Sequence, residues 1–209
     1  MRVRQPTTSR DRLRGPSTEQ SGDAKARTAL ARSLRQAARY LQCLTLQPQS
    51  VSIGQHIVTN GPFAVGFHPY FRIQNKQDID ITGIEPGTSY WYLPNALSKA
   101  EKDVVIAQNS SLTYVPGQHG SLNFATAEVN HHFDLAGAAI TPIILTDPGL
   151  QRRIRLERSA GYNGMTVWCN ADEERAVCIE PVTDRSGLLS VKPAPWRGWV
   201  RYTLEKLHH

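Results

Sequence analysis

The segment GFHPYF at positions 66–71 contains a histidine among aromatic residues. Side chains alternate along an extended chain, so His68 and Tyr70 share one face with Gly66, and the two phenylalanines share the other. The proline that follows His68 holds it in an extended conformation. His68 is therefore predicted to stand beside an aromatic ring and next to a glycine, where a ligand can approach. A histidine in the core or on the surface would give the same pattern.

A second segment, VCIEPVT at positions 177–183, places an acid at the end of an apolar run. The two aliphatic residues before the acid form the face expected to be buried, so Cys178 and Glu180 point to the opposite side. Burial near apolar groups raises the pKa of a carboxyl group, which suits Glu180 to general acid or base catalysis. A solvated carboxylate at a sheet edge is the alternative.

A third segment, EVNHHFDL at positions 128–135, gathers amide, imidazole and carboxylate groups around Phe133. These groups can form hydrogen bonds with several hydroxyls of a sugar, and a polar surface loop is the alternative interpretation. Adjacent side chains of an extended chain point to opposite sides, so His131 and His132 are poorly placed to chelate one metal ion together. We therefore expect no metal site here.

In order and approximate spacing, these segments resemble the motifs of the aldose 1-epimerase (galactose mutarotase) family. The matching family motifs are H-P-Y-F or H-x-Y-F, an acidic D-x-x-F segment, and C-x-E-P-x-[ST]. The resemblance runs from about residue 58 to about residue 204 and includes MTVWC at positions 165–169. It implies an all-β fold, the galactose mutarotase-like β-supersandwich, and acid–base isomerisation of a sugar hemiacetal without a cofactor.

The resemblance also implies roles for the candidate residues. Glu180 would be the base and protonated His68 the acid that open the ring of a free aldose such as glucose or galactose. Rotation about the C1–C2 bond and re-closure would convert the α anomer into the β anomer. Asn130 would hold sugar hydroxyls. Apolar faces for the C–H side of the sugar would come from Tyr70, Phe71 and Trp168.

Two features depart from the family pattern. Position 130 is Asn where the family usually has Asp, so a negative charge that would hold sugar hydroxyls is replaced by an amide. Residues 1–50 show no match to the N-terminal half of the family, which carries early strands and an Arg- or His-bearing substrate clamp. The sandwich is therefore expected to be incomplete, with open sheet edges and an unfinished sugar pocket.

Two other functions stay open at this point. An inactive or weakly active carbohydrate-binding remnant would follow from the unmatched N-terminal half. A relative acting on hexose 6-phosphates would need an arginine cluster near the pocket. Four arginines on one short strand could supply it, although such a run more often forms a solvated face: Arg152, Arg153, Arg155 and Arg158. The sequence leaves the aldose and the oligomeric state open.

Short β-like runs separated by turns follow residue 47, which is typical of an all-β sandwich or barrel. No long helical period follows, which argues against alternating β-α architecture. The expected strands are 51–59, 64–73, 79–84, 88–92, 103–107, 111–114, 139–145, 152–158, 165–169, 176–179, 188–191 and 198–205.

The first 47 residues differ from the rest, so we expect an extension over 1–47 and one domain over 48–209. Residues 1–23 lack a hydrophobic period and are expected to be disordered, and residues 24–42 have the spacing of an amphipathic helix. Residues 1–39 hold ten of the 24 basic residues and three of the 18 acidic ones. The body is therefore close to neutral, which argues against a nucleic-acid partner. An organelle transit peptide is an alternative for this arginine-rich start.

The three cysteines (Cys43, Cys169 and Cys178) are odd in number and lack the paired spacing of a zinc site. Neither a disulfide framework nor a structural metal is expected. No window approaches the roughly 18 apolar residues of a membrane-spanning helix, and no apolar signal region follows Met1. The expectation is a cytoplasmic protein that binds a small-molecule sugar, without a membrane partner.

Overall fold

The computed structural model describes residues 39–59, 63–108, 111–116, 122, 124, 128–136, 138, 140–170, 175–183 and 195–207. They belong to one compact unit, Ala38–His209. The described residues form two six-stranded antiparallel sheets and one helix, which confirms the predicted all-β class. The disorder expected for 1–23, the start of the helix expected over 24–42 and the strand expected at 188–191 lie outside the described residues.

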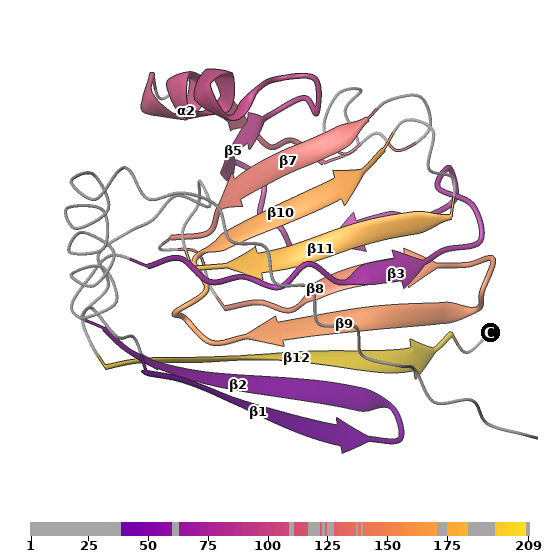
Figure 1. Ribbon diagram of the computed structural model, residues 1–209. Coiled ribbons are helices and arrows are strands. Elements are labelled where there is room, and N and C mark those ends of the chain that lie inside the picture. Colours follow the sequence, from indigo (N-terminus) through magenta and orange to yellow (C-terminus); the bar gives the residue numbers. More distant parts are fainter. Residues whose placement is uncertain are drawn as a thin grey trace, which may run out of the picture. The chain divides into compact units, whose positions relative to one another are not determined.

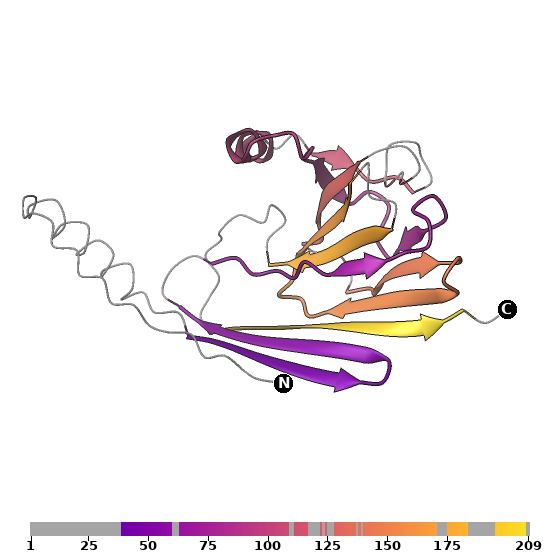
Figure 2. The same ribbon diagram turned by 45° about the vertical axis from the view of Figure 1, so that its right-hand side comes forward.

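The first sheet has the strand order β1-β2-β12-β9-β8-β4 (Figure 1). Its strands in chain order are β1 (Arg39–Gln47), β2 (Ser50–Val58), β4 (Asp80–Thr82), β8 (Ile143–Asp147), β9 (Arg152–Arg158) and β12 (Trp196–Lys206). The β1–β2 hairpin lies beside β12 (Figure 2). The sheet therefore joins the beginning of the described chain to its end.

The second sheet has the strand order β3-β11-β10-β7-β5-β6. Its strands in chain order are β3 (Tyr70–Arg72), β5 (Ser89–Tyr92), β6 (Leu112–Thr113), β7 (Val129–Asp134), β10 (Gly164–Cys169) and β11 (Ala176–Val182). Strand β7 is absent from the expected strands, because its polar residues hide the alternation of Val129 and Phe133, which are both buried. This missed strand carries the third motif.

The core consists of alternate side chains from the two sheets. In β12, Trp196, Val200 and Tyr202 are buried, and the residues between them are mostly exposed. In the second sheet, Phe133 and Val167 are fully buried. This period of two follows from the pleat of an extended chain, which sends successive side chains to opposite faces. The face of each strand that points away from the core is therefore available for residues that bind a ligand or react with it.

Residues Arg39–Gln47 correct the expected boundary at residue 47. They form β1, which pairs with β2 along nine residue pairs, so they are neither the end of a helix nor part of an extension. The helical spacing of Leu and Ala before this segment suggested a helix up to Gln42. Pairing with a neighbouring strand outweighs that local preference, because it satisfies the backbone groups of both strands.

A helix replaces the strand that was expected at 103–107. Helix α2 spans Lys99–Ala107, and Ser98 and Glu101 form a capping box at its start. In a capping box each side chain accepts a hydrogen bond from the other residue's backbone N–H, which stabilises the first turn. The S-x-x-E spacing at 98–101 was the available signal for this helix. In the described part of the chain, no helix is long and apolar enough to cross a membrane.

Candidate active site

A cavity of about 410 Å³ lies between the second sheet and α2. Ligand pockets in proteins commonly have volumes of about 300 to 1,000 Å³, so a sugar ring fits this space. The cavity is lined from the sheet and the segment before β3 by His68, Asn130, His132, Thr166, Trp168 and Glu180. The loop after β5 and helix α2 add Leu93, Asn95, Lys99, Lys102, Asp103 and Ile106.

The strand register brings the three motif segments together. On β10, Thr166 lies opposite His132 of β7 and opposite Glu180 of β11. Trp168, two residues further on, lies opposite Asn130. Because these residues are two apart on their strands, they share the face that points away from the core. Segments separated by a hundred residues of sequence thus meet on one surface.

Backbone hydrogen bonds hold the segment before β3 against β11. The N–H of Phe67 donates to the carbonyl of Pro181 at 3.2 Å, and the N–H of Thr183 donates to the carbonyl of Val65 at 2.9 Å. A Cβ on Gly66 would come within 2.7 Å of the Val182 side chain. The glycine therefore permits this close packing, and does not open a space for ligand as the sequence suggested.

His68 and Glu180 are in contact. The distance from His68 Nε2 to Glu180 Oε1 is 3.3 Å, and the side chains are 54% and 12% exposed. Burial raises the pKa of Glu180 to about 7, which confirms the direction expected from the sequence. A carboxyl group with this pKa exchanges its proton readily near neutral pH, and its histidine neighbour remains open to solvent.

Asn130 belongs to a network of buried polar groups. Its Oδ1 lies 2.9 Å from His132 Nε2, and Thr166 Oγ1 lies 3.0 Å from His132 Nδ1. Burial lowers the pKa of His132 to about 4, so the ring is neutral at pH 7 and donates from one nitrogen only. Asn130 Nδ2 donates to Asn95 Oδ1 at 3.1 Å, and Trp168 Nε1 donates to the same oxygen at 3.2 Å.

Sequence reasoning missed Asn95 and Thr166 in this network and gave His132 no role in it. The Asn130-x-His132 spacing could have placed His132 on the same face, because residues two apart share a face of a strand. Asn95 follows β5 in a loop and carried no comparable signal. Its contact with Trp168 and Asn130 depends on the pairing of β5 with β7.

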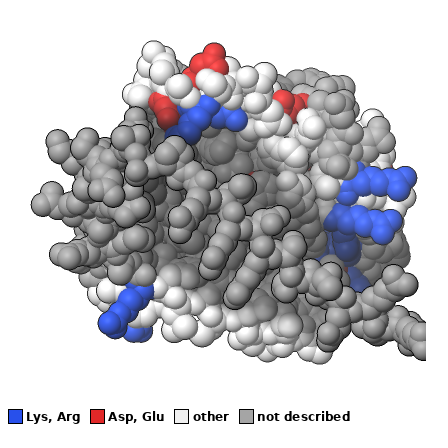
Figure 3. Space-filling model, viewed as in Figure 1, with Lys and Arg blue, Asp and Glu red and all other residues white. Residues whose placement is uncertain are grey.

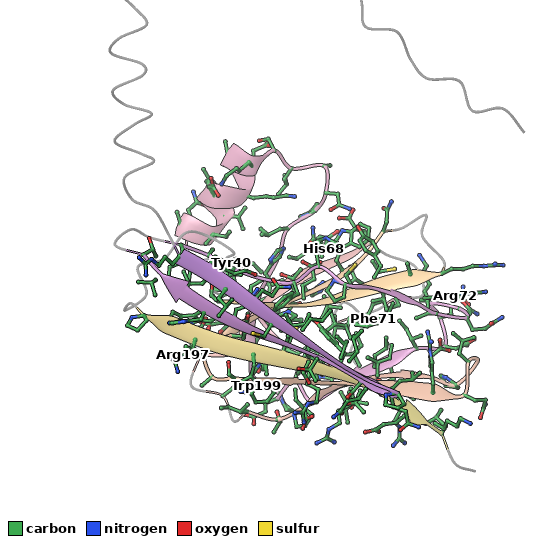
Figure 4. The ribbon with its side chains drawn as sticks, turned by 60° about the horizontal axis from the view of Figure 1, so that its bottom comes forward. Tyr40, His68, Phe71, Arg72, Arg197 and Trp199 are labelled. Carbon is green, nitrogen blue, oxygen red and sulfur yellow. The ribbon has the colours of Figure 1, made fainter. Side chains whose placement is uncertain are left out.

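The three aromatic residues that were expected to contact sugar have different surroundings. Trp168 lines the cavity. Tyr70 is exposed and stacks on His68 with a centroid distance of 5.0 Å, so it supports the histidine from outside the cavity. Phe71 contacts Tyr202 in the core at 5.4 Å. Phe71 and His68 are labelled in Figure 4. The sugar-contact prediction for Phe71 is wrong, because β3 turns that ring inward.

His68, Cys178 and Glu180 are also the described residues that could offer ligands to a metal ion, with ligand atoms within 4.8 Å of one another. All three cysteines are free thiols, and Cys178 is buried. Burial raises the pKa of Cys178 to about 12. The thiol is therefore protonated at neutral pH, and a protonated thiol is a poor metal ligand. Acid–base chemistry suits the group better.

The arginine run does not line this cavity. It lies on β9 of the other sheet, so it cannot serve the pocket in the way that the hexose 6-phosphate interpretation required. Lys99 and Lys102 of α2 supply positive charge instead. Lys99 Nζ lies 2.9 Å from Asp103 Oδ2. Figure 3 shows basic and acidic atoms side by side in the region that α2 occupies in Figure 1.

The chain is an antiparallel β-sandwich protein. It has a histidine–carboxylate pair at a cavity on one sheet that is large enough for a sugar. The sequence model of the family described as aldose 1-epimerase matches residues 37–205. The chain belongs to the aldose 1-epimerase family, as the three motifs predicted. The match begins two residues before β1, in agreement with the structural boundary. A search of curated proteins found no match.

Solved structures share this fold. The Slr1438 protein from Synechocystis sp. PCC 6803 matches with a TM-score of 0.60 and 23% identity, covering 82% of this chain and 56% of that chain. A galactose mutarotase-like protein from Clostridium acetobutylicum matches with a TM-score of 0.57 and 17% identity, covering 81% and 56%. The chain thus spans 56% of the length of either structure. The fold is galactose mutarotase-like.

Proposed function

We propose that the protein interconverts the α and β anomers of a free aldose such as glucose or galactose, without a cofactor. The observation that carries this proposal is the contact of His68 with Glu180 at the edge of a cavity of about 410 Å³. Membership of the aldose 1-epimerase family supports a role in carbohydrate epimerisation. An ionised Glu180 and a protonated His68 supply the base and the acid that ring opening needs.

The proposed reaction moves two protons. Glu180 takes the proton of the C1 hydroxyl, the C1–ring oxygen bond breaks, and His68 gives its proton to the ring oxygen. The open-chain aldehyde rotates about C1–C2, and the ring closes as both proton transfers reverse. The two oxygens are bonded to the same carbon, so an acid and a base in contact with each other can reach both at once.

The buried network forms the wall that would orient the sugar. The amide of Asn130 is held by His132 on one side and Asn95 on the other, so its direction does not change when a ligand enters. The half-buried Trp168 ring offers an apolar face to the C–H side of the sugar. Preorganised polar groups of this kind reduce the entropy lost on binding.

A second candidate function is the same isomerisation of an aldose that carries a phosphate. The observation that favours it is the pair of lysines on the α2 wall of the cavity. The positive charge of Lys102 acts on a residue of the site. After burial, it is the next cause of the lowered pKa of His132. A phosphate group placed near α2 would gain this attraction, whereas a neutral sugar would not.

Anomer exchange measured by NMR on the purified protein tests the proposal. Glu180→Gln and His68→Asn should each lower the rate roughly 100- to 10,000-fold, with sugar affinity within a small factor of wild type. Glu85→Gln, an exposed carboxylate outside the cavity, is the matched control and should leave the rate unchanged. The rate should rise with pH through about 7, because Glu180 ionises over that range.

Three results would change this conclusion. Binding of glucose or galactose without catalysis would indicate a carbohydrate-binding remnant. Faster turnover of glucose 6-phosphate than of glucose, lost in Lys102→Gln, would favour the second candidate. Full activity in Glu180→Gln would remove the acid–base assignment altogether.

A further inference from the structure

Strand β1 is the outermost strand of the first sheet in Figures 1 and 2. Among the described strands it pairs with β2 on one side and with none on the other. The other edges of the two sheets are short, because β4, β3 and β6 have three, three and two residues. The nine residues of β1, by contrast, run one-to-one along β2 without a bulge. The strand also contains no lysine or proline, the residues that often protect an edge from pairing with another chain.

The sheet register shows which backbone groups of β1 point away from β2. Successive residues of a strand turn their N–H and C=O groups to opposite neighbours. The N–H of Leu204 in β12 donates to the carbonyl of Gln49 at 2.7 Å. Odd-numbered residues from Gln49 into β2 therefore turn to β12, and even-numbered ones turn to β1, where their partners are odd-numbered. The residues of β1 that offer backbone groups to a further strand are Tyr40, Gln42, Leu44 and Leu46.

The apolar inner face of the first sheet continues onto β1 and is uncovered there. Leu44 lies opposite Ile53 of β2, and Leu46 lies opposite Val51. Residues that lie opposite each other on neighbouring strands share a face, and both β2 residues pack against the core. Leu44 and Leu46 are nevertheless 58% and 71% exposed. Exposed apolar side chains beside an open strand edge favour association with another chain.

A second copy of β1 fits this edge. When two copies run antiparallel about a twofold axis at Cys43, all nine residues pair, and the outward backbone groups of one copy meet those of the other. Leu46 then lies opposite Tyr40 of the second copy. Arg39 is the only charged residue of β1, and it lies opposite the neutral Gln47 of the second copy. Parallel pairing would instead place the two Arg39 side chains next to each other, which is unfavourable.

We propose that two copies of the chain form a dimer by antiparallel pairing of their β1 strands about Cys43, which joins the two first sheets into one. Cys43 lies opposite its own counterpart in a non-hydrogen-bonded pair, because its backbone groups turn to β2. The Cα atoms of such a pair are about 4.5 Å apart, which is within the range of about 4.4–6.8 Å for a disulfide. The thiol of Cys43 is exposed and free, whereas Cys169 and Cys178 are buried. The pairing uses no residue of the cavity that contains His68, so it does not depend on the proposed sugar chemistry.

Sedimentation velocity of the reduced full chain over a range of concentrations tests the dimer. Wild type should form a dimer that dissociates on dilution, and Cys43→Ser should do the same, because the pairing does not need the thiol. Leu44→Lys should weaken the dimer roughly tenfold or more, since an apolar contact is lost and the two new charges lie diagonally across the axis. Leu46→Lys should act in the same way. Ile140→Lys changes a similarly exposed aliphatic residue outside β1, and this matched control should dimerise like wild type.

Oxidation with diamide, a diazene, tests the register of the pairing. Two thiols form an S–S bond and lose two protons and two electrons, which the N=N group takes up to become a hydrazine. Wild type should give a disulfide-linked dimer on non-reducing electrophoresis. Thr45→Cys in a Cys43→Ser background is the matched control. Position 45 lies opposite position 41 of the second copy, so the two new thiols are four residues, or about 14 Å, apart and should crosslink far more slowly.

A folding control and three outcomes complete the test. The circular dichroism spectrum of Leu44→Lys should match that of wild type, because Leu44 is exposed in the single chain. The proposal is overturned if reduced wild type stays monomeric at every concentration, or if neither lysine variant on β1 weakens the dimer. It is also overturned if a cysteine at position 43 crosslinks no faster than one at position 45.

Discussion

Glu180 combines two properties at the scale of a single residue. Its side chain is 12% exposed, and its ionised form is disfavoured because burial removes water from the charge. The same burial that raises its pKa also makes the folded state less stable when the group is ionised. Reactivity and stability therefore change in opposite directions at this position, as is common at catalytic sites.

Glu180→Gln should accordingly stabilise the protein at high pH. The pKa of Glu180 rises from 4.5 to about 7 on folding, so the folded state binds more protons between these values and stability falls as pH increases through them. At pH 8 the variant should exceed wild type by up to about 3 kcal/mol in free energy of unfolding, and near pH 4 the difference should vanish. Denaturant unfolding at both pH values provides the measurement, and an equal effect at pH 4 would contradict the stated cause.

Asn130→Asp restores the residue that the family usually has, and should destabilise this chain. The new carboxylate cannot donate to Asn95 Oδ1 as the amide of Asn130 does at 3.1 Å. If Asn95 turns its amide to donate instead, the indole N–H of Trp168 loses its acceptor. We expect a loss of about 1–3 kcal/mol, the cost of one unsatisfied buried group. Thermal unfolding tests this, and an unchanged melting temperature would show that the network can rearrange freely.

At the scale of elements, helix α2 is the least anchored wall of the proposed sugar site. None of its residues is buried, so its capping box rather than its packing holds its first turn. The helix nevertheless contributes Lys99, Lys102 and Ile106 to the cavity. Local unfolding of α2 would therefore displace side chains that line the cavity.

Ser98→Ala should loosen α2 and weaken sugar binding. Loss of a serine N-cap costs about 0.5–2 kcal/mol, and α2 has no buried residue that could offset this loss. Hydrogen exchange of residues 99–107 should become faster, and KM should rise more than kcat falls, because His68 and Glu180 lie on other elements. Ser89→Ala, on β5 outside the cavity, is the control. Unchanged exchange in α2 would mean that other contacts hold the helix.

At the scale of the whole molecule, the first sheet depends on β1 although every residue of that strand is exposed. Nine residue pairs join β1 to β2. Gln55 is buried and links β1 to the core, because its Nε2 donates to Tyr40 Oη at 2.8 Å and its Oε1 accepts from Tyr162 Oη. The strand thus adds side-chain as well as backbone bonds to the sheet.

Two truncations should distinguish the contribution of β1 to stability from that of the residues before it. Removal of Met1–Ala37 should leave the melting temperature of the body unchanged, because the compact unit begins at Ala38. Removal of residues 1–47 should lower it, because β2 loses its partner and Gln55 loses Tyr40. Circular dichroism melts of both proteins give the comparison. Equal melting temperatures would show that the expected boundary at residue 47 was the correct one.

The two faces of the motif segments were predictable from sequence because side-chain alternation depends only on local backbone geometry. The alternation correctly placed His68 and Glu180 on the face opposite their inward-pointing neighbours. It also placed Phe71 on the face opposite His68. The error over Phe71 lay in its assigned role, since nothing local shows which face of a short strand meets the core.

Tertiary structure alone decided which residues meet and how strongly they are buried. The contact of His68 with Glu180 requires the segment at 65–67 to lie along β11, and the network of Asn130 requires a loop residue, Asn95, that no motif marked. The burial of Arg158 likewise depends on β12 beside β9. Pairing between distant strands and the exclusion of water are properties of the assembled sheets, so the pKa values and the cavity follow from the fold and not from any single segment.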